Sequence, residues 1–138
     1  MNADKQKAGI EIRQRATQYA LRAVKLYRHL YKTRDGIGLV LGKQYLRCAT
    51  AIGANLVEAQ SAETKRDFVH KCGIALKEAR ESKYWLSLLS EGHVVKPTRL
   101  AALFDETDQL VAILTRIIVN TKKNMGTGAT RDRILNVN

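Results

Sequence analysis

The sequence predicts an all-α protein, an antiparallel up-down-up-down four-helix bundle, and three observations favour this fold class. Apolar residues recur at three- and four-residue steps in four successive segments. Short polar or glycine-containing links separate the segments, so consecutive helices should run antiparallel. The 138-residue chain holds one proline and 6% aromatic residues, a composition that disfavours a β-sandwich or barrel. At this length we expect one compact domain.

The first two predicted helices are joined by a glycine turn. Residues 10–33 carry the helical period from Ile12 to Leu30. The sequence 34-RDGIG-38 predicts a turn at its glycines. A second helix then runs from about Leu39 to Gln60.

The third helix has the clearest start signal. Thr64 is predicted to cap it, with Asp67 three residues later in the place that glutamate takes in a capping box. This helix spans about Lys65 to Glu91, and Gly92 ends it.

The fourth helix is predicted to begin at Pro97, in its first turn, where proline is well tolerated. The apolar period is lost from Met125 onward. We therefore expect a bundle domain over residues 1–124 and a flexible C-terminal tail over residues 125–138.

The charge balance is the most informative bulk property. Twenty-four lysines and arginines against 13 acidic residues give a net charge of +11. This excess predicts a polyanionic partner, RNA or DNA ahead of an anionic membrane surface. The alternative is a charged surface that only promotes solubility.

Several features bear on the compartment. No apolar run approaches the roughly 18–20 residues needed to cross a bilayer, and the N-terminus MNADKQKAG does not resemble a signal peptide. We expect a cytoplasmic protein with no membrane partner. Cys48 and Cys72 lack metal-binding or redox spacing, so they are predicted to be reduced and buried, with no metal or cofactor.

A basic strip follows the first helix, opposite its apolar face. Its residues fall within about 140° of arc at about 100° per residue, and they are Arg15, Arg22, Lys25, Arg28 and Lys32. Such a strip suits contacts to phosphates without sequence readout; the alternative is a solvated face. Further basic residues lie toward the C-terminus: Arg116, Lys122, Lys123, Arg131 and Arg133.

The second and third helices indicate assembly. The second carries two adjacent apolar faces, of which one is predicted to meet another subunit, with Gly42 and Gly53 allowing close approach. The third places Tyr84 and Trp85 among charged residues, a composition typical of interface hot spots. The predicted subunit contacts are Gly53, Val57, Tyr84, Trp85 and Leu88. Alternatively, Trp85 covers the edge of its own core.

Four polar residues on these helices, Asn55, Glu58, Glu78 and Glu81, are predicted to fix helix register through polar contacts. Glu78 and Glu81 stand at i and i+3, but no histidine forms the Glu-x-x-His pair of a di-metal bundle site. Ion pairing is favoured, with Lys77 as one candidate partner for Glu81. No hydrolase, zinc-protease or P-loop motif is present, which predicts a protein that is not an enzyme.

The stretch 52-IGANLVEAQSAETKRDFVHKCGIALKEARESKYWLSLL-89 closely resembles a bacterial family of four-helix bundles first noted as proteins encoded in 23S rRNA intervening sequences. Its shared elements are IGAN, EAQ, K-x-DF, IALKEARE and YWL. The resemblance implies a homo-oligomer, with ring-shaped pentamers among relatives, and no catalytic residues.

One basic branch of that family is the accessory variability determinant of diversity-generating retroelements, which associates with a reverse transcriptase and binds nucleic acid. The resemblance and the charge together predict such an accessory subunit, binding RNA or DNA as a pentamer. The alternative is a structural or protein-interaction module without nucleic-acid binding.

Overall fold

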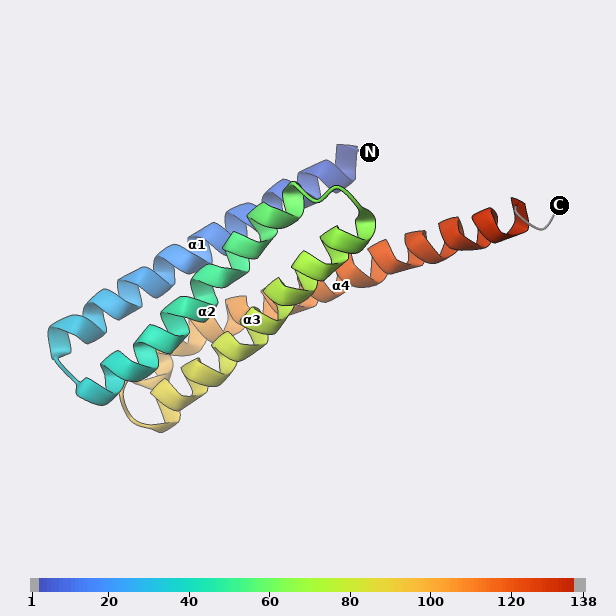
Figure 1. Cartoon of the computed structure of the whole chain (residues 1–138). Helices are drawn as coiled ribbons and strands as arrows, with labels where there is room; N and C mark the ends of the chain where they lie inside the picture. The colour runs from blue at the N-terminus through green and yellow to red at the C-terminus, as the bar shows by residue number, and fades with distance from the viewer. Residues whose placement is uncertain (1–2, 136–138) are drawn as a thin grey trace.

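The protein is an antiparallel up-down-up-down bundle of four helices, as predicted (Figure 1). The computed structural model describes the backbone of residues 3–135 and the side chains of residues 3–126 apart from Lys5. The helices are α1 (Ala3–Thr33), α2 (Gly36–Gln60), α3 (Lys65–Glu91) and α4 (Pro97–Leu135). The described residues contain no strand, and none of their helices is long and apolar enough to cross a membrane.

The turn between α1 and α2 differs from the predicted glycine turn. Arg34 makes the reversal in the left-handed region, with φ of 55°. The Asp35 carboxylate accepts hydrogen bonds from the backbone N–H groups of Ile37 (3.0 Å) and Gly38 (3.1 Å). Because this cap satisfies the first free N–H groups of the helix, α2 begins at Gly36, earlier than the predicted Leu39.

Both predicted ends of α3 are confirmed. The Thr64 hydroxyl accepts a hydrogen bond from the Asp67 backbone N–H at 3.0 Å. Gly92 forms the C-cap, where a Cβ would lie 2.6 Å from the carbonyl oxygen of Leu88. Such a contact is too close for any side chain, so the glycine is required by the approach of the chain to its own last helical turn.

The core lies between the four helices and combines small residues with aliphatic and tyrosine side chains. Tyr19, Tyr45, Leu86 and Leu110 are among its fully buried large residues. Alanines also line it, which lets the helices approach closely. They are Ala16, Ala23, Ala49, Ala59, Ala75 and Ala79.

Two glycines of the second apolar face of α2, the face predicted to meet another subunit, pack against α1 of the same chain. A Cβ on Gly42 would lie 2.6 Å from Cδ1 of Leu30, and one on Gly53 would lie 3.7 Å from Cβ of Ala16. Both neighbours belong to α1. In this bundle α2 packs against α1 on one side and α3 on the other, so two apolar faces arise without any assembly.

The last helix continues beyond the point where its apolar period ends. It reaches Leu135, and its C-terminal part projects past the loop that joins α2 and α3 (Figure 1). A helical segment that packs against no neighbouring helix needs no apolar stripe. The end of the apolar period therefore does not mark the end of α4. The flexibility predicted for the tail stays a prediction, and residues 136–138 lie outside the described part.

Candidate nucleic-acid and subunit interfaces

Four residues of the predicted basic strip lie together on the outer face of α1. Arg22, Lys25, Arg28 and Lys32 are all exposed. None of the four forms an ion pair within the described residues. Their helical positions span one contiguous outward arc. The strip thus presents four positive charges to solvent, and no described carboxylate engages them.

Arg15, the fifth member of the strip, is engaged inside the chain. Its Nε and Nη2 atoms donate to the two carboxylate oxygens of Glu106 at 2.9 and 3.0 Å, and Nη2 also donates to Gln109 at 2.6 Å. The hydrogen bond to Glu106 raises the pKa of Arg15. This residue therefore joins α1 to α4, and a phosphate would have to compete with Glu106 for it.

A shallow groove beside Arg15 mixes both signs of charge. It is lined by Glu11, Gln14, Arg15, Gln18, Tyr19, Arg22 and Glu106. Two carboxylates in the lining disfavour an anionic ligand at this end of the strip. The part of the strip best suited to phosphates is accordingly Arg22 to Lys32.

The predicted subunit contacts do not share one face. Gly53 packs against Ala16 of its own α1. Val57 is 59% exposed and lines a second groove, with Ile10, Arg13 and Gln60, between α1 and α2. Tyr84, Trp85 and Leu88 belong to α3.

The two neighbouring aromatic residues of α3 differ in how far they are exposed to solvent. Trp85 is half-buried and packs against the core of its own chain, in agreement with the alternative that it covers a core edge. Tyr84 is 56% exposed and meets Trp85 edge-to-face, with ring centroids 5.1 Å apart. Leu88 is partly exposed beside them in sequence. The outward-facing aromatic surface is therefore mainly that of Tyr84.

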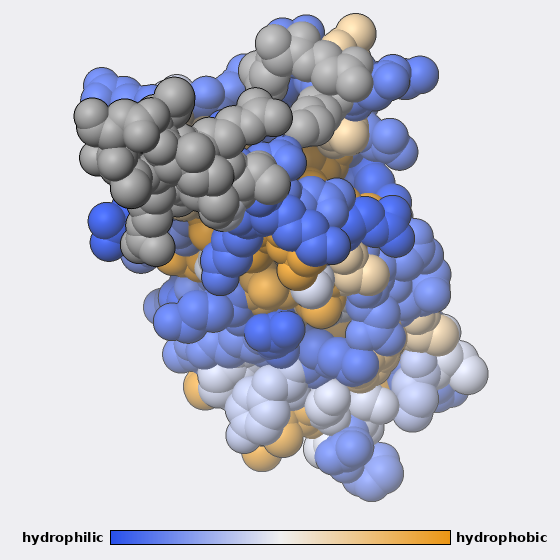
Figure 2. All heavy atoms as spheres, turned by 90° about the vertical axis from the view of Figure 1, so that its right-hand side faces the viewer, coloured by the Kyte–Doolittle hydropathy of each residue, from blue (hydrophilic) through white to orange (hydrophobic). Residues whose placement is uncertain are grey.

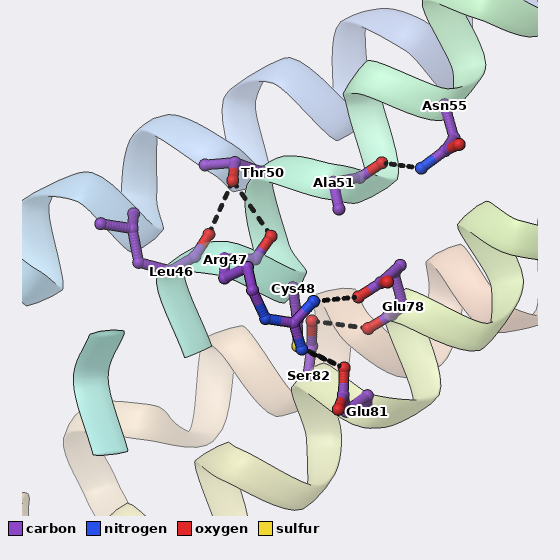
Figure 3. Close-up of polar contacts among 9 residues, drawn as sticks. All are labelled: Leu46, Arg47, Cys48, Thr50, Ala51, Asn55, Glu78, Glu81 and Ser82. Atoms are coloured by element: carbon purple, nitrogen blue, oxygen red, sulfur yellow. Dashed lines mark hydrogen bonds and ion pairs between the residues drawn. The ribbon is translucent and has the colours of Figure 1, made fainter. Parts of the chain in front are cut away.

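A polar cluster joins α2 to α3 at mid-length (Figure 3). The Arg47 guanidinium reaches Glu81 at 2.6 Å and Glu78 at 3.4 Å. The Cys48 thiol donates a hydrogen bond to the same Glu81 oxygen at 2.7 Å. Glu81 thus pairs with Arg47 of the neighbouring helix, and its predicted pairing with Lys77 is wrong. The α2–α3 contact is the most extensive in the bundle, and it brings Arg47 within reach of Glu81.

The cluster sets the protonation of its members. Hydrogen bonds from Cys48 and Arg47 lower the pKa of Glu81. Burial, together with the hydrogen bond to Glu81, raises the pKa of the Cys48 thiol. Burial alone raises the pKa of Cys72 to about 11. Both cysteines are free and buried, as predicted, and neither has the depressed pKa of a reactive thiol.

The same cluster offers donor atoms that a metal ion could use. One ligand atom each from Cys48, Glu78 and Glu81 lies within 4.8 Å of the others. However, the positively charged Arg47 occupies the space between the carboxylates, bonding to both of them. A guanidinium there supplies the charge compensation that a cation would otherwise provide. The donor set fits an ion-pair network better than a metal site.

The remaining predicted register residues lie on α2. Glu58 accepts from Lys71 of α3 at 2.6 Å, a second cross-helix ion pair. Asn55 instead donates to the carbonyl of Ala51, one turn earlier in its own helix (Figure 3). Asn55 therefore makes no cross-helix bond here, because its amide is satisfied locally.

Nothing in the sequence pattern indicated the buried hydrogen bond between α1 and α4. Tyr19 and Thr107 are fully buried, and their hydroxyl oxygens lie 2.6 Å apart. Thr107 donates its proton to the carbonyl of Leu103 at 2.6 Å, so Tyr19 is the donor in this pair. Helical periodicity places each residue on a core face, but it cannot pair hydroxyls 88 residues apart.

These features define a class of protein. It is a basic four-helix bundle with a positively charged strip on the outer face of α1, and ion pairs and a buried hydrogen bond join its helices. The profile of the 23S rRNA-intervening sequence protein family matches residues 9–116. The chain belongs to that family, which confirms the resemblance drawn from residues 52–89.

A solved relative shares the fold. It is a protein of unknown function from the S23 ribosomal protein family of Bacteroides thetaiotaomicron, 33% identical to this chain, with a TM-score of 0.75. The similarity covers 80% of this chain and 97% of the relative. No curated protein matches the chain. The family and fold are thereby shown, and neither description names a catalytic activity.

Proposed function

We propose that this protein is a non-enzymatic, homo-oligomeric scaffold that binds RNA or DNA through the phosphate backbone. The observation that carries the proposal is the outer face of α1, where Arg22, Lys25, Arg28 and Lys32 are exposed and form no ion pair with any described residue. The net charge of +11 supports it, because a polyanion would relieve the repulsion among these groups.

A salt titration tests the proposal. The wild-type protein is expected to bind an RNA hairpin or a DNA duplex with an affinity that falls steeply as salt rises, since binding releases condensed counterions. Arg28→Ala/Lys32→Ala should reduce the slope of log affinity against log salt by about 2, roughly 1 for each phosphate contact. Lys77→Ala/Arg80→Ala removes the same charge from exposed positions on α3 and is the matched control.

Absence of binding at low salt would contradict the nucleic-acid proposal. It would favour the alternative, a structural or protein-interaction module of the same family. Equal losses in the strip variant and its control would show that net charge alone matters, and not the face of α1.

We also propose self-assembly, with a pentameric ring as the expected form. Exposed large apolar side chains support it where they adjoin one another, as Ile10 and Val57 do in the groove between α1 and α2, because contiguous apolar surface marks interaction sites. The exposed ones are Ile10, Leu21, Tyr31, Ile37, Val40, Val57, Tyr84 and Val119. They lie on several helices, which suits contacts to more than one neighbouring subunit.

Sedimentation of Tyr84→Ala tests the assembly. Tyr84 is a sharper choice than Trp85, because truncation of Trp85 would also damage the core of the subunit. The variant should shift toward monomer, whereas Arg99→Ala, which shortens an exposed side chain of α4 outside the predicted contacts, should not. An unchanged oligomer in both variants would refute the placement of the interface on Tyr84.

Within the family, the strong positive charge favours the branch that serves diversity-generating retroelements as the accessory variability determinant. The proposed protein partner is therefore a reverse transcriptase. Co-purification with a reverse transcriptase encoded beside this gene tests that partner, and the absence of any such neighbouring gene would weigh against it.

A further inference from the structure

The C-terminal part of α4 lies outside what this chain shares with its family. The family profile ends at residue 116, whereas α4 continues to Leu135. The solved relative is covered almost completely, at 97%, while only 80% of this chain is covered. Among the side chains that the structure describes, up to residue 126, Ile118 is the last apolar one of α4 that packs against the core. We call residues 119–135 the C-terminal arm; the shared bundle is complete without it.

The arm projects from the end of the bundle and is basic. In Figure 1 it leaves the bundle at the end where the N-terminus and the loop between α2 and α3 lie. Its sequence, VNTKKNMGTGATRDRIL, holds four basic residues and one acidic residue. Lys122 and Lys123 are exposed, while the side chains of Arg131 and Arg133 lie outside the described part. Viewed from this end, hydrophilic side chains cover most of the bundle, with apolar atoms showing between them (Figure 2).

The composition of the arm argues against docking on the bundle. The large apolar residues in its sequence are Val119, which is 44% exposed, Met125, Ile134 and Leu135, and they do not recur at three- and four-residue steps. A stripe this sparse cannot hold a helix against a protein surface. A positively charged helix with little apolar surface is instead suited to a polyanion, where charge supplies the affinity.

We propose that the arm is a second phosphate-binding element, which contacts the phosphodiester backbone of a nucleic acid held by the oligomer. This inference rests on the proposed function. In an assembly of several copies, each subunit would add one arm, and the repeated weak contacts would increase the avidity. The first contacts assigned to the arm are Lys122 and Lys123.

The arm also holds a glycine that bears on how it binds. A Cβ added to Gly126 would meet nothing within 4 Å, so alanine fits there without a clash. Glycine lowers helix stability by about 1 kcal/mol relative to alanine. If the arm binds as a helix, Gly126→Ala should tighten binding by up to about fivefold, because about 1 kcal/mol of ordering cost is removed before binding.

The experiment measures salt-dependent binding of the full-length protein to an RNA hairpin and to a DNA duplex with the same stem sequence. Lys122→Ala/Lys123→Ala should lower the salt slope by about 2 on the nucleic acid that is bound. A reduction on RNA or on DNA supports the proposal and identifies which of the two the arm contacts. Lys77→Ala/Arg80→Ala again serves as the matched control, and circular dichroism verifies that every variant keeps its helices.

The failure of this proposal is distinguishable from the failure of the proposed function. If Arg28→Ala/Lys32→Ala lowers the slope and the arm variant matches wild type, the arm proposal is overturned and the function stands. Equal losses in the arm variant and the α3 control also overturn it. If wild type binds neither probe at low salt, both are overturned. An arm variant that loses slope beyond the control, with Gly126→Ala at or above wild-type affinity, supports it.

Discussion

The helix pairs α2–α3 and α1–α4 are held together in different ways. Between α2 and α3 the ties are ion pairs at the surface, Arg47 with Glu78 and Glu81, and Lys71 with Glu58. Between α1 and α4, which contact each other least of the neighbouring pairs, a buried hydroxyl pair and a partly buried bidentate ion pair provide the ties.

This difference shows which polar contacts should matter for stability. Solvent-exposed ion pairs contribute about 0–1 kcal/mol, because water competes for both charges. A buried hydroxyl that loses its partner costs about 1–3 kcal/mol. Because α2 and α3 share the most extensive helix contact, we expect their ion pairs to add little to stability, whereas the smaller α1–α4 contact should depend more on its polar contacts.

The largest effect is expected from Thr107→Val. This change keeps the shape of the side chain but leaves the buried Tyr19 hydroxyl without its acceptor. Stability measured by urea denaturation at fixed protein concentration should fall by about 1–3 kcal/mol.

Tyr45→Phe provides the matched control for that prediction. Its hydroxyl is buried in the same core, edge-to-face with Tyr19, and has no hydrogen-bond partner within the described residues. Removing a buried group that is already unsatisfied should leave stability unchanged or raise it. Equal losses in both variants would contradict the importance assigned to the Tyr19–Thr107 bond.

An intermediate effect is expected from the Arg15–Glu106 pair. Its side chains are only 29% and 20% exposed, and its geometry is bidentate. A double-mutant cycle with Arg15→Met and Glu106→Gln should give a coupling free energy of about 1 kcal/mol. A coupling free energy of zero would mean that this pair contributes no more than the exposed ion pairs between α2 and α3. The difference inferred between the two helix interfaces would then be wrong.

The smallest effect is expected at Glu81. Its side chain is 41% exposed, so Glu81→Gln should cost about 0.2–1 kcal/mol at neutral pH. Because its pKa is lowered in the folded protein, the contribution is present above the unfolded glutamate pKa of about 4.3 and is lost as pH falls through the folded pKa.

Denaturation at neutral and acidic pH measures this contribution. The difference between wild type and Glu81→Gln should shrink as the pH drops below about 4. Glu63→Gln, at an exposed loop position without an ion pair among the described residues, should show no such convergence. A difference that grows with acid would mean that folding raises the pKa of Glu81, against the hydrogen bonds that Arg47 and Cys48 donate to it.

The sequence predicted the fold well and the interfaces less well. The Thr64 cap and Gly92 located both ends of α3, and the period-3.6 pattern with Pro97 located the ends of α1 and α2 and the start of α4, because caps and amphipathic faces are local properties. The start of α1 at Ala3 precedes the predicted residue 10. The predicted start of α2 at Leu39 is wrong, because the glycines of 34-RDGIG-38 indicated a turn over that stretch. Asp35 instead caps the helix, which begins at Gly36. An apolar pattern does not show what covers a face: Gly42 and Gly53 pack against α1, while Val57 of the same face is 59% exposed, so a subunit contact there stays a prediction.

The sequence by itself determined the helical class, the positive charge and the family, since periodicity, composition and a continuous motif are all readable along the chain. Only the tertiary structure decided which charges are available. Arg15 is paired with Glu106 and Glu81 with Arg47 in place of Lys77. The exposed basic residues of α1 are Arg22, Lys25, Arg28 and Lys32. The physical reason is that an ion pair depends on distance between helices, and helical spacing along one segment carries no information about that distance.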